Sequence, residues 1–190
     1  MALLTGCHKP CTLPNYDFSV SDFFSPEKDS VTVGDTLWLI SNISNVQVDI
    51  NSGAQVDFSG AENLGFNLVV SDISKFRSQR GAVDSFDYTK RHGDIYTHPS
   101  SNPQGIKQLS FEKTMASYML EVGLIAKKKG SYLLTVPDNP YVFRQDMPKC
   151  GTAAFAILNS NANKHLYLFE NYWGKLNQYD STHSYCFKVY

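Results

Sequence analysis

Residues 30–41 read Ser-Val-Thr-Val-Gly-Asp-Thr-Leu-Trp-Leu-Ile-Ser, and this stretch decides the fold class. Apolar and polar residues alternate before Gly34-Asp35, and Leu37 and Leu39 resume the alternation after it. Such alternation is typical of a strand with one face buried. An interruption by glycine lets a strand turn a corner between two packed sheets. The stretch therefore predicts a mainly β protein built as a sandwich.

The same alternation recurs along the chain. Core strands are expected where every second residue is apolar, at residues 64–70, 118–124 and 132–136. Residues 15–24 alternate less regularly, and we expect them along a sheet edge. The chain is therefore predicted to consist largely of short strands joined by polar turns.

Tyr132 lies in the sequence Gly130-Ser-Tyr-Leu-Leu-Thr-Val136, which follows a lysine-rich turn. This pattern resembles the start of the penultimate strand in immunoglobulin-like sandwiches, where a tyrosine hydroxyl reaches back to the backbone at the sheet corner. The resemblance implies an antiparallel, immunoglobulin-like β-sandwich. We expect a tether over residues 1–14 and one domain over 15–190, with its core at about 30–136 and an extension at 137–190.

The composition excludes several classes of protein. The chain has 190 residues, of which 42% are hydrophobic and 18% charged, so it is globular and long enough to bury a core. Its formal net charge is −1 and its basic residues are dispersed, which removes the basic surface of a nucleic-acid-binding protein. No motif indicates a cofactor, and none is expected.

The cysteines predict an oxidising compartment. Cys150 and Cys186 lack the spacing of a zinc site. We expect a disulfide between them that links the C-terminal subregion, since disulfides form in an oxidising compartment. Such a bridge would stabilise the fold by restraining the unfolded chain. The connectivity stays open, since Cys7 and Cys11 could also pair.

Two segments of the extension are ambiguous. Residues 153–158 are apolar without a breaker and suit either a strand or a helix. Residues 163–174 suit a hairpin or, slightly better, a short helix that begins at an asparagine cap and stops at Gly174. Such a helix would present Leu166, Phe169 and Trp173 on one face.

The N-terminus contains Leu4-Thr5-Gly6-Cys7, which resembles a bacterial lipobox, the tetrapeptide whose cysteine receives lipid. The polar, proline-containing residues 8–14 suit a tether between an anchor and a domain. Only six residues precede Cys7 and none is basic, whereas a signal sequence needs a basic and an apolar region. Either the reading frame extends further upstream or the match is accidental, and we prefer the lipoprotein interpretation.

An enzyme is the alternative. Cys150 could act as a nucleophile, with His165 or His183 as the base, if a helix N-terminus or an imidazolium lowered its pKa. We prefer the disulfide because Cys186 offers a partner in a chain that looks exported. A pair of carboxylates for glycoside hydrolysis stays open, although no spacing nominates one.

Carboxylates and histidines gather in the least regular part of the sequence. They could suggest a metal, but they lack the spacing of a calcium loop and the paired histidines of a zinc helix. A solvated loop is the better interpretation, so no metal is expected. The residues concerned are Asp84, Asp87, His92, Asp94 and His98.

Aromatic residues crowd the last third of the chain, which offers a binding function. On a β-sandwich, exposed tyrosine and tryptophan can stack on sugar rings or anchor a protein partner, although many such residues only fill the core. The candidate binding residues are Tyr141, Tyr167, Tyr172, Trp173 and Tyr179.

Taken together, the lipobox-like Cys7 and the β-sandwich pattern make the chain similar to small lipid-anchored, extracytoplasmic β-sandwich proteins of Gram-negative bacteria. The resemblance implies a location that is periplasmic, anchored to the outer membrane, or at the cell surface. It also implies a non-enzymatic binding or assembly role at the envelope, with a protein or glycan partner. The membrane would be contacted through the lipid anchor only. A Cys/His or paired-carboxylate hydrolase remains the alternative.

Overall fold

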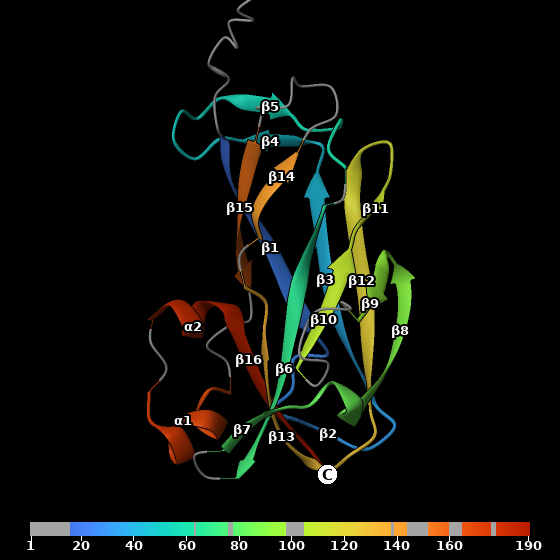
Figure 1. The fold of residues 1–190 in the computed structure, drawn as a ribbon, viewed down its shortest axis with the longest axis vertical. Helices are drawn as coiled ribbons and strands as arrows, with labels where there is room; N and C mark the ends of the chain where they lie inside the picture. The colour runs from blue at the N-terminus through green and yellow to red at the C-terminus, as the bar shows by residue number, and fades with distance from the viewer. Residues whose placement is uncertain are drawn as a thin grey trace, which may run out of the picture.

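Two sheets pack face to face in the computed structural model, with two short helices at one side of the sandwich (Figure 1). The structure describes residues 16–62, 64–75, 78–97, 105–137, 139–143, 152–159, 165–175 and 178–190. Cys7, Cys11, His98 and Cys150 lie outside these ranges, as does the proposed tether. The predicted β-sandwich architecture is confirmed.

Sheet 1 has the strand order β11-β12-β3-β1-β15-β14, and β8 also pairs with β12. Its strands are β1 (Tyr16–Ser25), β3 (Thr36–Ser44), β8 (Phe86–His92), β11 (Glu112–Lys113), β12 (Ser117–Ala126), β14 (Asn139–Phe143) and β15 (Thr152–Asn159).

Sheet 2 has the order β2-β16-β13-β6-β10-β9, and β7 also pairs with β6. Its strands are β2 (Ser30–Val31), β6 (Gly65–Lys75), β7 (Ser78–Gly81), β9 (Asp94–Tyr96), β10 (Ile106–Ser110), β13 (Gly130–Thr135) and β16 (Ser184–Val189). A separate hairpin joins β4 (Val46–Val48) to β5 (Gln55–Asp57), and a 3-10 turn spans Val83–Ser85. The helices are α1 (Tyr167–Trp173) and α2 (Gln178–His183).

Most strand pairs are antiparallel, as predicted, but two are parallel: β1 with β15, and β2 with β16. Both parallel pairs join the N-terminal part of the chain to its last forty residues. The expected extension at 137–190 is therefore interleaved with the sandwich, because β15 belongs to sheet 1 and β16 to sheet 2. Of the two forms that residues 153–158 could take, the strand is the one observed.

The predicted corner at Gly34-Asp35 is confirmed. The chain leaves sheet 2 after β2 and enters sheet 1 as β3. Gly34 has φ +96°, a conformation that residues with a side chain rarely adopt. The Asp35 carboxylate accepts hydrogen bonds from the Thr32 N–H and hydroxyl, both at 2.8 Å, which fixes the turn.

Tyr132 makes the backbone contact that its sequence context predicted. Its ring is buried between the sheets, and its hydroxyl donates a hydrogen bond of 2.9 Å to the carbonyl of Lys128, in the turn before β13. The contact closes the corner of sheet 2 from within the core. The finer assignment to the immunoglobulin-like class stays a prediction.

The position of β1 differs from expectation. It lies between β3 and β15 in the middle of sheet 1, not along an edge. Its inward side chains include Phe18, which packs against Phe58 and Phe155 with ring centroids 5.4 Å and 5.3 Å away. The partner on one side, β15, comes more than a hundred residues later, so the local alternation alone could not reveal it.

Candidate binding surface

Helix α1 covers the outer face of sheet 2 (Figure 1). Leu166 and Phe169 are buried and Trp173 is partly buried. Together they pack against a patch formed by Ile73, Leu133 and Cys186 of sheet 2. The predicted helix and its apolar face are thus confirmed.

The ends of α1 agree only in part with prediction. Gly174 ends the helix with φ +84°, and its N–H donates to the Glu170 carbonyl at 3.1 Å. The N-cap is Leu166, which makes no side-chain cap hydrogen bond. The expected cap, Asn163, lies outside the described residues.

Three exposed tyrosines and a lysine lie where α1 meets the end of β16. We call Tyr167, Tyr172, Lys188 and Tyr190 the tyrosine patch. Between 47% and 59% of each tyrosine's surface is exposed. Tyr172, Lys188 and Tyr190 line a shallow pocket of about 250 Å³ together with Ser74 and Ser131. The patch therefore combines ring faces, hydroxyl groups and one cation around a hollow.

Hydrogen bonds and charges keep the patch polar. The Tyr167 hydroxyl donates to the Asp29 carboxylate at 2.7 Å, which raises the pKa of Tyr167 and lowers that of Asp29. The Lys188 Nζ lies 5.6 Å from the centroid of the Tyr190 ring, within reach of a cation–π contact. The patch thus places phenol hydroxyls beside the Lys188 ammonium.

The predicted aromatic residues divide into three groups. Tyr167 and Tyr172 belong to the tyrosine patch, whereas Trp173 turns toward sheet 2 and stacks on Phe169 at 5.6 Å. Tyr141 lies on β14 and Tyr179 on α2, but their side chains are outside the described part of the structure.

Lys188 and Tyr190 were missed by sequence reasoning. Alternation along the final strand carries the necessary signal, because Cys186, Lys188 and Tyr190 share a face while Tyr185 and Phe187 point into the core. The Arg91 guanidinium lies 4.0 Å from the centroid of the Trp38 ring and covers that face, and Gly123 packs close to the same ring. At the tyrosine patch itself, the exposed tyrosines are the aromatic groups that a partner can reach.

The residues considered for thiol catalysis do not form a site within the described residues. Cys186 has a free and fully buried thiol. Burial, with a smaller effect of Glu170, raises its pKa to about 12, so the thiolate is disfavoured. His165 packs with its ring edge-on to Tyr185, at 5.7 Å. Because Cys150 lies outside the described residues, the Cys150–Cys186 disulfide stays a prediction.

We expect Cys186 to resist thiol reagents in the native protein and to react once the chain is unfolded. The reason is its burial, which both blocks the reagent and keeps the sulfur protonated. A variant with serine at positions 7, 11 and 150 isolates this thiol for labelling by iodoacetamide. If the unmutated chain, unfolded without reductant, leaves Cys186 unlabelled, the sulfur is in a disulfide and the free-thiol state is wrong.

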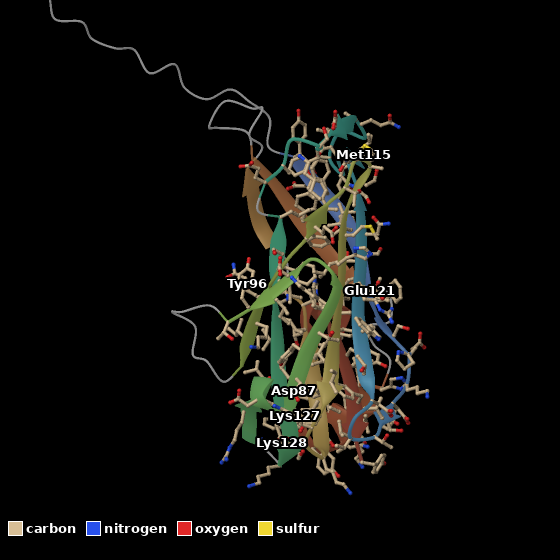
Figure 2. The ribbon with its side chains drawn as sticks, turned by 90° about the vertical axis from the view of Figure 1, so that its right-hand side faces the viewer. Asp87, Tyr96, Met115, Glu121, Lys127 and Lys128 are labelled. Carbon is tan, nitrogen blue, oxygen red and sulfur yellow. The ribbon has the colours of Figure 1, made fainter. Side chains whose placement is uncertain are left out.

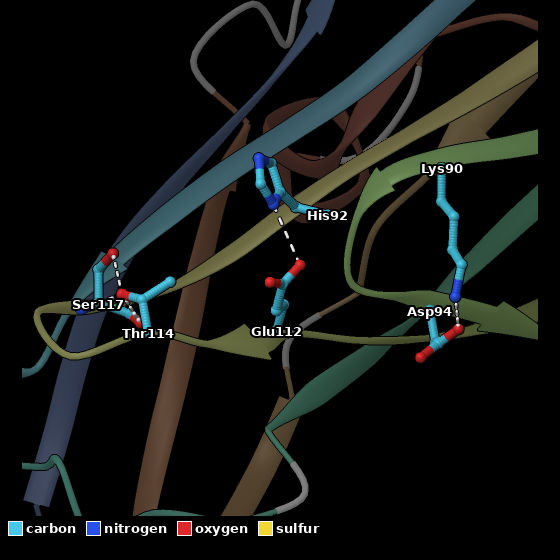
Figure 3. Close-up of polar contacts among 6 residues, drawn as sticks. All are labelled: Lys90, His92, Asp94, Glu112, Thr114 and Ser117. Carbon is cyan, nitrogen blue, oxygen red and sulfur yellow. Dashed lines mark hydrogen bonds and ion pairs between the residues drawn. The ribbon is translucent and has the colours of Figure 1, made fainter.

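The acidic and histidine residues of the irregular segment point to separate partners (Figure 3). His92 Nδ1 lies 3.0 Å from Glu112 Oε2, and Lys90 pairs with Asp94. Asp87 pairs with Lys127 at 2.8 Å, and both are labelled in Figure 2 toward the end of the molecule opposite Met115. Within the described ranges, no three histidine, cysteine or carboxylate side chains are grouped to hold a metal ion.

Comparisons with known proteins show likeness in overall fold only. No protein-family model matches the chain, and no curated protein sequence matches it. The reeler domain of human F-spondin covers 93% of this chain and 94% of its own, at 8% identity and a TM-score of 0.38. The seventh ScaB type I cohesin of Pseudobacteroides cellulosolvens covers 80% and 98%, at 10% identity and 0.35.

A type II cohesin from Acetivibrio cellulolyticus covers 74% of this chain and 92% of its own, at 9% identity and a TM-score of 0.34. At these identities and TM-scores the likenesses carry no argument about function. Among the described residues, neither helix has the length and apolar character that crossing a membrane requires.

Proposed function

We propose that the protein is a non-enzymatic binding module of the cell envelope that holds its partner at the tyrosine patch. The observation that carries the proposal is the pocket between Tyr172 and Tyr190, two half-exposed rings with Lys188 and two serines around them. Rigid aromatic side chains supply large contact areas at a small cost in side-chain entropy. A binding role therefore fits the patch better than a reaction does.

A glycan is the partner that this pocket favours over a protein. Its volume of about 250 Å³ is below the usual range for drug-sized ligands and suits a single sugar ring. The hydroxyl groups of the tyrosines and the Lys188 ammonium can bond sugar hydroxyls, while the ring faces pack on the sugar's apolar side. A protein partner that uses the three tyrosines as anchors is the second possibility.

The envelope location rests on Cys7 as a lipid-modified residue. Residues 8–15 separate this cysteine from Tyr16, the first residue of β1. Strand β1 begins beside the β4–β5 hairpin, at the end of the molecule opposite the C-terminus and α1 (Figure 1). An anchor at Cys7 would therefore leave the tyrosine patch facing away from the membrane.

The test is a glycan array probed with the fluorescently labelled full chain, followed by calorimetry on any glycan that binds. Tyr172→Ala and Tyr190→Ala should each weaken binding about tenfold, which corresponds to roughly 1.4 kcal/mol. Tyr96→Ala is the matched control, because Tyr96 is 45% exposed but lies on β9, at the edge of sheet 2 far from β16 (labelled in Figure 2). An array without binding, or an equal effect of the control, would contradict the glycan proposal.

A further inference from the structure

The β4–β5 hairpin exposes a row of aliphatic side chains to solvent. Val46, Val48 and Ile50 are 49%, 54% and 57% exposed, and Met115 beside them is fully exposed. These four residues, here called the apolar tip, lie at the end of the molecule labelled at Met115 in Figure 2. Single exposed aliphatic residues are normal on a protein surface, but four exposed apolar side chains on neighbouring segments indicate a contact surface.

The hairpin geometry holds this row outward. Strand β4 alternates, so that Gln47 and Asp49 point inward while the valines point away from the body. Val46 and Val48 are partnered by Asp57 and Gln55 of β5. The tip is therefore an ordered sheet face that no described element covers.

Hydrogen bonds fix the apolar tip to the first residues of β1. The Asp49 carboxylate accepts from the Asp17 N–H at 2.9 Å, and the Ile50 N–H donates to the Asp17 carbonyl at 2.8 Å. On the other side, the Asn45 side-chain amide donates to the Met115 carbonyl at 2.8 Å. The tip thus lies where the chain enters the domain from its N-terminal side.

We infer that the apolar tip docks on a lipid bilayer, entering the boundary between headgroups and acyl chains, so that the membrane contact extends beyond the lipid anchor alone that the sequence led us to expect. The inference rests on the lipid anchor of the proposed function. Eight residues separate Cys7 from Tyr16, and even a fully extended chain of that length reaches only about 30 Å. A lipid on Cys7 would keep the tip at high effective concentration beside the membrane. Aliphatic side chains at that depth leave water without needing a specific partner.

The charges around the tip decide which lipids suit it. Asp57 faces Val46 across the hairpin, and Asp17 is exposed beside Ile50. Carboxylates at the surface are repelled by anionic headgroups, whereas zwitterionic headgroups impose no such repulsion. The tip therefore fits a zwitterionic leaflet better than an anionic one.

The test places an environment-sensitive nitrobenzoxadiazole probe on the tip of the full chain. Val48→Cys carries the probe, and Val33→Cys is the matched control, because Val33 is 47% exposed but lies at the Gly34 corner. Cys11 and Cys150 are changed to serine, and Cys186 is buried. Each lipidated chain is reconstituted into phosphatidylcholine vesicles, with acylation of Cys7 verified by mass spectrometry.

We expect the emission at position 48 to move to shorter wavelength and to be quenched by doxyl-labelled lipid, and that at position 33 to do neither. Adding Ile50→Asp should abolish the shift, and adding phosphatidylglycerol should reduce it. No shift at position 48, or equal shifts at both positions, overturns the inference. A shift seen only in vesicles made from native membranes with their proteins also overturns it, because the occupant would then be a protein.

Failure of the anchor is distinguishable from failure of the docking. If mass spectrometry finds no lipid on Cys7, the proposed anchor is wrong. A histidine tag at the N-terminus, bound to nickel-chelating lipid, then holds the chain at the same vesicles, and the probe still reports on the tip. Glycan binding at the tyrosine patch is measured separately and does not depend on either result.

Discussion

Replacing Asp22 with asparagine should stabilise the protein by a few kcal/mol at about pH 8 and change little at about pH 4. Asp22 lies on the inward face of β1 and is completely buried. Burial raises its pKa from 3.8 to about 7, opposed by its own backbone N–H and by His183. Three pH units correspond to about 4 kcal/mol, which is the upper limit of the effect.

The direction of the effect on stability follows from which state, folded or unfolded, loses the Asp22 proton first as the pH rises. Well below pH 3.8 the Asp22 carboxyl is protonated in the folded and the unfolded chain alike, and at about pH 4 the unfolded chain has only begun to gain from ionisation. Between about pH 4 and pH 7 the unfolded chain ionises first, so stability falls as the pH rises, and it levels off above the folded pKa. Asparagine cannot ionise and removes this loss.

Urea denaturation at both pH values measures the effect, and Asp87→Asn serves as the control. The Asp87 side chain is 63% exposed and pairs with Lys127, so its removal should give no comparable gain at high pH. A loss of stability in Asp22→Asn at about pH 8 would show instead that a charged Asp22 beside His183 supports the fold.

Local patterns in the sequence predicted the local features of the fold. The corner at Gly34-Asp35 and the backbone contact of Tyr132 each depend on residues within a few positions, and both are observed. The place of a strand in a sheet depends instead on distant partners. The local alternation of residues 15–24 therefore predicts an edge strand, whereas β15 pairs with β1 from the far end of the chain.

The binding surface was predicted in part for a similar reason. The helical spacing of Leu166, Phe169 and Trp173 already indicates that Trp173 faces the core. Tyr172, one position earlier, lies about 100° away around the helix axis and so reaches the surface. What the sequence could not show is that α1 packs beside the end of β16, which brings Tyr190 to Tyr172 across a shared pocket.

The two exposed surfaces lie at opposite ends of the molecule. The apolar tip is beside the start of β1, whereas Tyr190 ends the chain after β16, at the end marked C in Figure 1. A chain anchored at Cys7 would thus have one end suited to lipid and the other suited to a hydroxyl-rich partner. The placement of the two surfaces at opposite ends links the two proposals, although each is tested by its own experiment.

Phe155→Ala should lower the free energy of unfolding by about 3–5 kcal/mol, which is usual when a buried phenylalanine is removed from a core. Phe155 is 2% exposed, and its ring lies 5.3 Å from both Phe18 and Phe58. The substitution would leave a cavity where β15 joins the start of β1. Thermal and urea denaturation, monitored by circular dichroism, measure the change.

The control is Phe23→Ala, because Phe23 lies on β1 but is 41% exposed, so its removal should cost less than about 1 kcal/mol.

The unfolding transition of Phe155→Ala also tests the interleaved topology. If the residues after 136 were an appendage to a self-sufficient core, Phe155→Ala would leave the main unfolding transition in place. Since β15 pairs directly with β1 within sheet 1, we expect the whole transition to shift to lower denaturant concentration as one cooperative step.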